Sequence, residues 1–431
     1  MSLIESDNSI LFLLLFLSFI FILSNLKKKG KTKKKNFSKI IGLKSVKQEI
    51  KYYMEFIKNK DKYIDWNVKI PKGILLAGAP GTGKTLLIKT ISEELDIPLI
   101  TASGSEFIEK YVGVGAARVR KLFNRAKSKK SCIIFIDEID AVGRKRDFDN
   151  NSERSSTVNQ LLTEMDGFNE TSNIIVFAAT NLVNILDPAL TRSCRFDKKI
   201  YFDLPNNDER IEMYKLYLDD MILPNNISFQ ILAERTAGVS GADIANIANQ
   251  SKINAIKNHN NTKFLRDEDI QEAIDEILIG REKRERILSK DERIRVAHHE
   301  AGHCFMGYVL NYCEQPIKVS IIPRGEAALG FSQQKPTNKK LMIENEILSK
   351  ISVLLGGRSA EKIFFNNVST GASDDIEKIS LLIKNYSEYW GMNNKIGPLN
   401  IKVLENYGNE LSDELNNTIK KIINDIESQT I

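Results

Sequence analysis

Hydrophobic and polar positions along residues 37–204 predict a parallel α/β sheet. Three short runs, Ile74–Ala77, Ile133–Ile136 and Asn173–Ala179, are apolar with almost no polar interruption. Between the first two runs, residues 86–95 have apolar side chains at helical spacing. Strands that lack a polar face are buried on both sides, as in parallel sheets covered by helices. We therefore expect an α/β domain over 37–204.

Downstream of residue 204 the spacing becomes helical. The clearest helical segments are Glu209–Leu218, Ser240–Lys257, Asp267–Leu278 and Glu414–Ile426. A charged linker, Arg281–Arg286, separates two groups of them, and Ser289 with Glu292 forms a capping-box signal that opens another helix. We expect a helical domain over 205–280 and a mainly α-helical domain over 285–431.

The N-terminal 36 residues differ from the rest. Residues Ile10 to Leu26 are 17 in number and uncharged. As a helix they would span about 25 Å, slightly less than the hydrocarbon core of a bilayer. Glu5 and Asp7 precede the run and seven lysines follow it between Lys27 and Lys35. This arrangement predicts an uncleaved single-pass membrane anchor over 1–36 with the remainder of the chain on the cytoplasmic side. An uncleaved export signal and a buried core helix are the alternatives.

Composition and charge narrow the function classes. The chain of 431 residues is 42% hydrophobic and 27% charged, which is typical of globular proteins with more than one domain. Without the seven clustered lysines, 55 basic residues balance 56 acidic ones, so we expect no nucleic-acid partner. The four cysteines lack a C-x-x-C spacing, which favours a reducing compartment and argues against a cysteine-ligated zinc site.

A phosphate-binding loop follows the first apolar run. The residues are Gly78, Ala79, Pro80, Gly81, Thr82, Gly83, Lys84 and Thr85, which match G-x-x-x-x-G-K-[ST]. The glycines let successive backbone N–H groups face phosphate oxygens at a helix N-terminus. Lys84 is expected to contact the β- and γ-phosphates of ATP, and the Thr85 hydroxyl to ligate Mg²⁺. A glycine-rich connector is the alternative.

Two later strand ends extend this nucleotide site. Asp137 and Glu138 end the second apolar run, where Asp organises Mg²⁺ and Glu polarises the attacking water in P-loop enzymes. Asn181 ends the third run, in position to hold that water or to sense the γ-phosphate.

A second set of chemical groups lies in the last third of the chain. His299, Glu300 and His303 form H-E-x-x-H on an expected helix, and three of the four histidines lie within six residues. Two histidines four residues apart share one helix face, so both rings can bind one Zn²⁺, and Glu300 can accept a proton from the attacking water. His298 lacks such a partner.

A catalytic zinc needs a third protein ligand. Carboxylates at Glu361, Asp374 and Asp375 are available, and spacing alone does not choose between them.

Taken together, the motifs resemble the FtsH family of AAA+ ATPases. They are GAPGTGKT, IIFIDEIDAVGRKR, QLLTEMDGF, AATN, LDPALTR, GVSGADIANIAN, HEAGH, GGRSAE and TGASDDI, and they extend from about Phe37 to Lys421. The resemblance implies a homohexameric ring, a helical lid over 205–280 and a zinc metallopeptidase domain over 285–431. It also implies that Asp375 is the third zinc ligand.

The resemblance implies further site residues. Arg192 and Arg195 match the arginines that reach the nucleotide of the next subunit, although Ser193 and Cys194 replace the usual Pro-Gly between them. Tyr111, Val112 and Gly113 match the pore loop that grips a translocating polypeptide, with Tyr in place of the usual Phe. Gly241 and Ala242 would lie near the adenine. The segment Val319–Gly325 is similar to the strand beside the active site, which could pair with an extended substrate.

The sequence thus predicts a membrane-anchored, ATP-dependent zinc metalloendopeptidase that unfolds and degrades membrane and cytoplasmic proteins, with Zn²⁺, ATP and Mg²⁺ as cofactors. One alternative is an AAA+ unfoldase with an inert peptidase domain. A membrane scaffold with a degenerate ATPase is another, and Lys84, Asp137 and Glu138 argue against it.

Overall fold

The computed structural model describes most of the chain from residue 40 to Ile431. The residues outside the description are 1–39, 59–62, 64, 67–71, 110, 112, 130, 145–151, 168–172, 193–194, 226, 260–262, 284–287, 325–328, 336–338, 340, 394 and 405–408. The predicted membrane anchor lies among them. Within the described part of the chain, no helix is long and apolar enough to cross a membrane.

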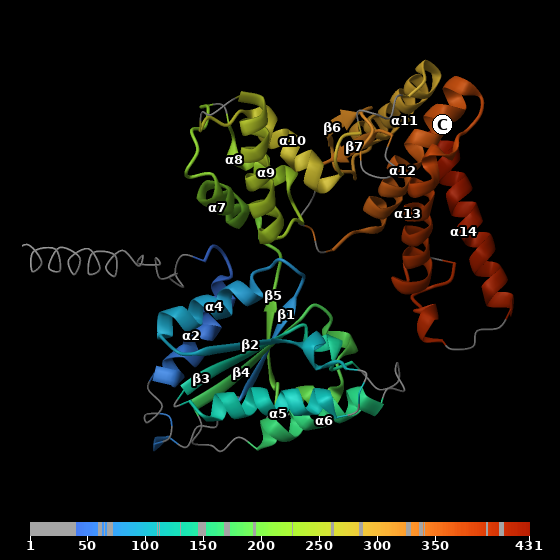
Figure 1. The fold of residues 1–431 in the computed structure, drawn as a ribbon. Helices are drawn as coiled ribbons and strands as arrows, with labels where there is room; N and C mark the ends of the chain where they lie inside the picture. The colour runs from blue at the N-terminus through green and yellow to red at the C-terminus, as the bar shows by residue number, and fades with distance from the viewer. Residues whose placement is uncertain are drawn as a thin grey trace, which may run out of the picture. The chain divides into compact units, whose positions relative to one another are not determined.

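The described chain divides into two compact units between Asp203 and Leu204. The first unit is built on a parallel sheet with strand order β2-β3-β4-β1-β5 (Figure 1). Its strands are β1 (Gly73–Gly78), β2 (Leu99–Ser103), β3 (Ser131–Asp137), β4 (Asn173–Thr180) and β5 (Lys198–Phe202). The predicted parallel sheet is therefore confirmed. The carboxyl ends of β1, β3 and β4 lie at one edge of the sheet, so the phosphate loop, Asp137 and Asn181 are brought to that edge.

Helices cover both faces of this sheet (Figure 1). Helices α2 (Lys44–Lys58) and α4 (Lys84–Leu95) pack on one face, and α5 (Val114–Lys127) with α6 (Ser152–Asp166) pack on the other. Alternate residues of β3 enter the two cores: Ile133 and Phe135 on the α4 side, Ile134 and Ile136 on the α5 side. Burial on both faces explains the missing polar face. Short 3₁₀ turns connect these elements: η2 (Gly104–Phe107), η3 (Ile139–Ala141), η5 (Val183–Ile185) and η6 (Pro188–Thr191).

Strand β5 was not anticipated from the hydrophobic pattern. Its sequence KKIYF begins with two lysines, and only Ile200 and Phe202 are buried. The strand pairs with β1 at the edge of the sheet, where charged side chains are common because one side of the strand faces solvent.

The second unit begins with a group of helices. These are α7 (Asn207–Tyr217), α8 (Phe229–Arg235), α9 (Gly241–His259) and α10 (Asp267–Leu278). The three helical segments predicted in this region correspond to α7, α9 and α10. Their shared core is built around Tyr214, Leu232, Ile247 and Ile270, all at most 1% exposed.

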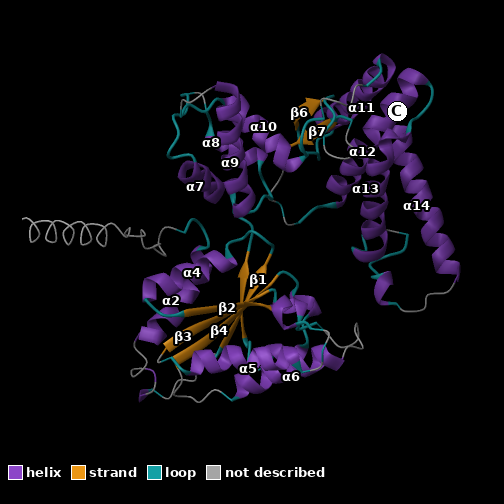
Figure 2. Ribbon diagram, in the orientation of Figure 1, coloured by secondary structure: helices purple, strands orange, loops and turns teal. Residues whose placement is uncertain are grey.

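The remainder of the second unit is mainly helical (Figure 2). Its elements are α11 (Lys290–Val309), β6 (Pro316–Ser320), β7 (Phe331–Gln334), α12 (Glu344–Phe365), η7 (Thr370–Ala372), α13 (Ser373–Lys384), the π-helix η8 (Asn385–Tyr389), η9 (Ile401–Val403) and α14 (Asn409–Thr430). The predicted capping box is present, because Ser289 Oγ accepts from Glu292 N at the start of α11. Helices α11 and α12 approach closely at glycines: a Cβ on Gly302 would lie 2.3 Å from the carbonyl oxygen of Gly356.

The strand expected over 319–325 begins and ends earlier than the sequence suggested. Strand β6 covers Pro316–Ser320 and pairs antiparallel with β7. Ser320 pairs with Phe331, the first residue of β7, so the ladder ends there. Beyond it Ile322 N donates to Ser320 Oγ, and the carbonyl of Pro323 accepts from Lys283 N instead.

A buried carboxylate joins the two parts of the second unit. Asp275 on α10, 2% exposed, accepts hydrogen bonds from Arg235 (3.0 Å) and from Lys318 on β6 (2.5 Å). Arg324 Nη2 lies 3.5 Å from the same carboxylate. Because a buried charge is costly without partners, this cluster holds α8, α10 and β6 in a fixed relation.

We predict that the second unit loses stability in alkali through Tyr214. Burial raises the pKa of Tyr214 to about 12. Since the folded pKa exceeds the usual value of about 10, the stabilisation is complete below that pH and is lost as pH rises towards 12. Between about pH 8 and about pH 12, the free energy of unfolding should fall by about 2 kcal/mol less in Tyr214→Phe than in the parent protein, because each pKa unit corresponds to about 1.4 kcal/mol. Urea unfolding at the two pH values measures this difference. The exposed Tyr201 provides the control substitution Tyr201→Phe, which should follow the parent. Identical losses in parent and Tyr214→Phe would contradict the prediction.

Candidate metal centre and nucleotide site

The phosphate-loop residues adopt the geometry that the motif requires. The loop leaves β1 at Gly78 and enters α4 after Gly83, whose φ of 96° lies in the left-handed region that glycine tolerates. Thr82 Oγ1 donates to the carbonyl of Ala79 at 2.8 Å and tightens the turn. The first turn of α4 therefore presents backbone N–H groups at the carboxyl edge of the sheet.

Four predicted nucleotide residues meet at this edge. Lys84 Nζ donates to Asn181 Oδ1 at 2.9 Å and to the carbonyls of Gly78 (2.7 Å) and Ala79 (2.9 Å). Thr85 Oγ1 donates to Asp137 Oδ2 at 2.8 Å. Burial lowers the pKa of Lys84, and the nearby charge of Asp137 opposes that shift. The arrangement offers a cation for phosphate and an oxygen pair for Mg²⁺.

Glu138 follows Asp137 in an unusual conformation. Its φ of 50° places a non-glycine residue in the left-handed region, and the side chain is exposed. Such backbone strain costs about 1 kcal/mol or more and occurs often at functional sites.

The two predicted in-trans arginines differ in their surroundings. Arg192 is exposed. Arg195 donates to both carboxylate oxygens of Asp166 at 3.0 and 2.8 Å and to the carbonyl of Ala189 at 2.8 Å. The hydrogen bond from Arg195 lowers the pKa of Asp166. Arg195 is thus held within its own chain, and its role towards a neighbouring subunit stays a prediction.

The other predicted binding residues lie on different elements of the chain. Tyr111 is 77% exposed, and Gly113 precedes α5 with a φ of 85°. Val112 is outside the described residues. Gly241 and Ala242 begin α9 in the second unit, and their predicted proximity to adenine stays a prediction.

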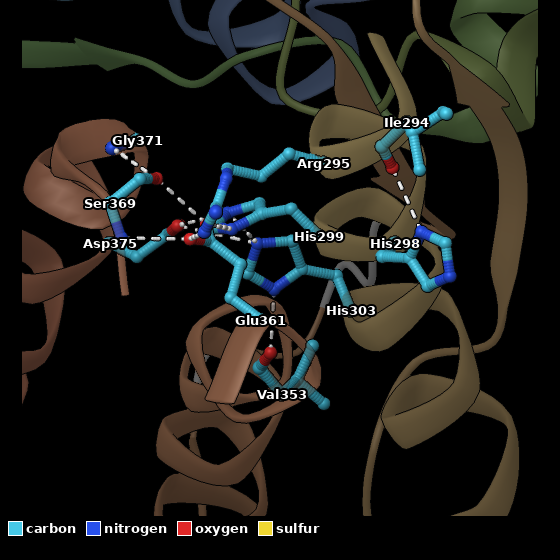
Figure 3. A network of polar contacts seen from close by, with 10 residues as sticks. All are labelled: Ile294, Arg295, His298, His299, His303, Val353, Glu361, Ser369, Gly371 and Asp375. Atoms are coloured by element: carbon cyan, nitrogen blue, oxygen red, sulfur yellow. Dashed lines mark hydrogen bonds and ion pairs between the residues drawn. The ribbon is translucent and has the colours of Figure 1, made fainter. Parts of the chain in front are cut away.

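The second site forms between α11, α12 and α13 (Figure 3). His299 and His303 are buried on one face of α11, and the first turn of α13 brings Asp375 to them. Asp375 Oδ2 lies 3.3 Å from Nε2 of each ring, and the two Nε2 atoms are 3.0 Å apart. Of the described His, Cys, Asp and Glu side chains, these three form a group whose ligand atoms all lie within 4.8 Å.

Hydrogen bonds on the far side of each ring set which nitrogen faces this point. His299 Nδ1 lies 2.8 Å from Glu361 Oε1, and His303 Nδ1 lies 2.8 Å from the carbonyl oxygen of Val353. Because both partners are acceptors, Nδ1 carries the hydrogen in each ring, and Nε2 of the neutral ring presents a lone pair. Two lone pairs and a carboxylate oxygen then converge, which is an arrangement that needs a cation.

Space for a metal ion is left by a glycine. A Cβ on Gly357 of α12 would lie 2.5 Å from His303 Nε2 and 2.6 Å from His299 Nε2. Any larger residue would fill the volume in front of both ligand atoms. The donor set of two imidazoles and one carboxylate is also one that catalytic zinc uses. The residues present therefore fit Zn²⁺.

Electrostatics around the cluster follow from burial and close pairing. Burial would raise the pKa of Asp375, but its close pairing with His299 and His303 outweighs burial and holds the pKa well below the usual range. For His299, burial favours the neutral ring, whereas Asp375 and Glu361 raise its pKa overall. Glu300 is 7% exposed, and burial raises its pKa while the two histidines oppose the shift.

The other two candidate ligands are placed differently. Asp374 is exposed and pairs with Lys378 at 2.6 Å. Glu361 is 1% exposed and faces Nδ1 of His299, on the opposite side of the ring from Asp375. Glu361 also accepts from Ser369 N at 2.8 Å, Ser369 Oγ at 3.0 Å and Arg295 Nη1 at 3.1 Å (Figure 3). It therefore orients a ligand and ties α11 to the segment that leads to Asp375.

Sequence reasoning missed several residues of this site. Arg295, Ser369 and the Val353 carbonyl were not singled out, because ordinary side chains and backbone groups carry no spacing signal. Gly357 had a detectable signal: two consecutive glycines inside a helical pattern suggest a close approach. His298, as expected, does not join the cluster; its Nδ1 lies 2.8 Å from the carbonyl of Ile294.

We predict that removing the Glu361 carboxylate weakens zinc binding without removing a ligand. Substitution Glu361→Gln should weaken zinc affinity about 10- to 100-fold, because His299 loses the charged acceptor that orients it. The measurement is competition for zinc with a chromophoric chelator. The matched control is Glu346→Gln, on the same helix but paired with Lys339 at the surface. Equal affinities for Glu361→Gln and the parent would contradict the assignment.

In comparison with known proteins, three family models match successive parts of the chain. The model for the ATPase family associated with various cellular activities (AAA) matches residues 74–204. The AAA+ lid domain model matches 226–272, and the Peptidase family M41 model matches 286–430.

Curated relatives match nearly all of the chain. It is 42% identical to a Rhodothermus marinus protein over 91% of this chain and 58% of that protein, and 41% identical to one from Parabacteroides distasonis over 92% and 59%. A Helicobacter pylori protein is 43% identical over 90% of this chain and 62% of its own length. All three are named ATP-dependent zinc metalloprotease FtsH. The chain spans about three-fifths of the length of these relatives. The resemblance predicted from the motifs is confirmed, and the chain belongs to the FtsH family.

Proposed function

We propose that this chain is an ATP-dependent zinc metalloendopeptidase that unfolds and degrades proteins. The observation that carries the proposal is the convergence of His299 Nε2, His303 Nε2 and Asp375 Oδ2, beside a buried Glu300, in a chain that also has a complete phosphate loop. The relatives' printed names support the same activity.

The peptidase chemistry divides between the ion and the chain. A Zn²⁺ ion held by the two histidines and Asp375 would polarise the scissile carbonyl and lower the pKa of a water molecule. Glu300 accepts the proton of the attacking water and delivers it to the amine that leaves when the peptide C–N bond breaks. Burial raises the pKa of Glu300 from its ordinary value towards neutrality, which suits a group that must both accept and release a proton.

The nucleotide chemistry uses the first unit. Lys84 exchanges its carbonyl partners for the β- and γ-phosphates of ATP, and the oxygens of Thr85 and Asp137, which are hydrogen-bonded to each other here, would hold Mg²⁺. Glu138 polarises the attacking water, and Asn181 orients it near the γ-phosphate. Gly241 and Ala242 border the adenine. Arg192 and Arg195 reach the nucleotide of the next subunit, for which Arg195 exchanges its pairing with Asp166.

Assembly and location complete the proposal. The chain forms a homohexameric ring in which Tyr111, Val112 and Gly113 grip polypeptide, and residues 1–36 anchor it in a membrane with both units on the cytoplasmic side. The domains are 37–204 for the ATPase, 205–280 for its lid and 285–431 for the peptidase. Substrates are unfolded or membrane-extracted proteins.

An unfoldase with an inert peptidase domain is the alternative function. Absence of one of the three cluster residues or of Glu300 would favour it, and this chain has all four.

We predict that the two chemistries separate by single substitutions. Glu300→Gln should reduce cleavage of a loosely folded protein by about 10²- to 10⁴-fold while ATP turnover persists, because only the proton acceptor is lost. Glu138→Gln should abolish ATP turnover while a short peptide is still cleaved. The measurements are fluorescent peptide release and phosphate release on the same preparations.

The adjacent position provides the control. His298→Gln should leave peptide cleavage within about twofold of the parent, since this ring lies outside the metal cluster. Undiminished cleavage in Glu300→Gln would refute the assigned base, and a parent protein that hydrolyses ATP but cleaves nothing would favour the inert-peptidase alternative.

A further inference from the structure

A buried carboxylate on α6 contacts the loop that precedes α5. Glu153, in the first turn of α6, is 5% exposed. Its Oε2 accepts from Gly113 N at 2.8 Å, and its Oε1 accepts from Gly115 N at 3.3 Å. The contact joins segments about forty residues apart in the chain, and neither the sequence motifs nor the proposed chemistry uses it.

Helix α5 lacks a cap of its own. Gly113 is its N-cap residue and has no side chain, and the first turn contains no acidic residue. The N–H groups of a first helical turn need acceptors, and an anion there also interacts favourably with the helix dipole. Glu153, on the neighbouring helix, supplies both the hydrogen-bond acceptors and the negative charge. A capping box supplies such acceptors within one helix.

The start of α5 is packed so closely that no side chain fits at Gly115. A Cβ on Gly115 would lie 2.3 Å from the Phe107 carbonyl oxygen and 2.5 Å from Thr157 Oγ1. The backbone at Gly115 is therefore pressed between the end of η2 and α6. Only a glycine fits, and its N–H lies within reach of Glu153.

The opposite end of the same loop is fixed as well. Phe107 is 3% exposed, and Arg118 on α5 donates to the carbonyl of Glu106 and pairs with Glu109, both at 2.5 Å. Between these fixed ends, Tyr111 is 77% exposed. The loop has an exposed aromatic tip on a base that is anchored at both ends.

We propose that Glu153 is a positioning residue that anchors the base of the loop before α5, which carries Tyr111. Force on Tyr111 is then transmitted to the body of the ATPase unit. The inference rests on the proposed role of Tyr111 in gripping polypeptide. Without the carboxylate, the first turn of α5 unwinds when force acts on the loop. Tyr111 then moves relative to the ATPase unit and does not pull the polypeptide. ATP is then hydrolysed without advancing the substrate.

Two readouts on the 431-residue chain test the anchor. The first is amide hydrogen exchange at Gly113–Gly115, where Glu153→Ala should increase the rate about tenfold, the effect of losing a helix cap. The second is the number of ATP molecules hydrolysed for each molecule of a stably folded, tailed protein degraded, which should rise at least about fivefold. Glu153→Gln keeps one acceptor oxygen at the same reach and should give intermediate values for both.

Control substitutions distinguish the loss of the Glu153 contact from a general loss of stability and from a failure of the proposed role of Tyr111. Glu164→Gln, on the same helix but paired with Lys127 at 2.7 Å, should match the parent in both readouts. Faster exchange in Glu153→Ala with unchanged ATP consumption would overturn the positioning role, and if Glu153→Ala fails to fold, Glu153→Gln decides by the same criteria. Unchanged degradation in Tyr111→Ala would instead reject the gripping role of Tyr111, and the exchange rates would still report whether Glu153 holds the loop.

Discussion

The metal centre of the second unit depends on one electrostatic constraint: three electron-pair donors meet where water is largely excluded. His299 and His303 direct their Nε2 atoms at each other and at Asp375 because Glu361 and the Val353 carbonyl occupy their Nδ1 sides. Buried acceptors repel one another unless a cation joins them. The close packing of α11 on α12 through Gly302, Gly356 and Gly357 follows from the same requirement, since larger residues would push the helices apart or fill the metal position.

The first unit solves the opposite problem, since it must hold an anion. Its parallel sheet gathers Lys84, Thr85, Asp137 and Asn181 at one edge, and the N-terminus of α4 faces the same edge. Glu153 applies the same principle to α5, where a carboxylate from a neighbouring helix satisfies the exposed N–H groups of a first turn. In both units, a helix end or a helix face provides some of the polar groups of a site, and side chains distant in sequence provide the others.

Much of this was predictable from the sequence, for physical reasons. Fully apolar strands predicted a doubly covered parallel sheet, and the i, i+4 histidine pair predicted a shared metal because helical periodicity fixes which residues share a face. Long-range partners were harder: no local rule chooses Asp375 over Asp374, yet the turn at η7 directs one inward and leaves the other paired with Lys378 at the surface. Glu361 was one of the candidate third ligands, because a ligand and a residue that orients a ligand have the same sequence signature. Strand β5 was missed because its lysines are also typical of a loop. The strand expected after Val319 ends at Ser320, because its partner β7 begins at Phe331 and offers no further residue to pair with.

The most direct test compares bound zinc in two adjacent substitutions, Asp375→Ala and Asp374→Ala, each purified under the same conditions. Atomic emission measures the metal, and zinc X-ray absorption measures its neighbours. The account predicts about one zinc per chain with nitrogen and oxygen neighbours at about 2.0–2.2 Å in the parent and in Asp374→Ala, and a large loss of zinc in Asp375→Ala. Full zinc content in Asp375→Ala, or its loss in Asp374→Ala, would contradict the account.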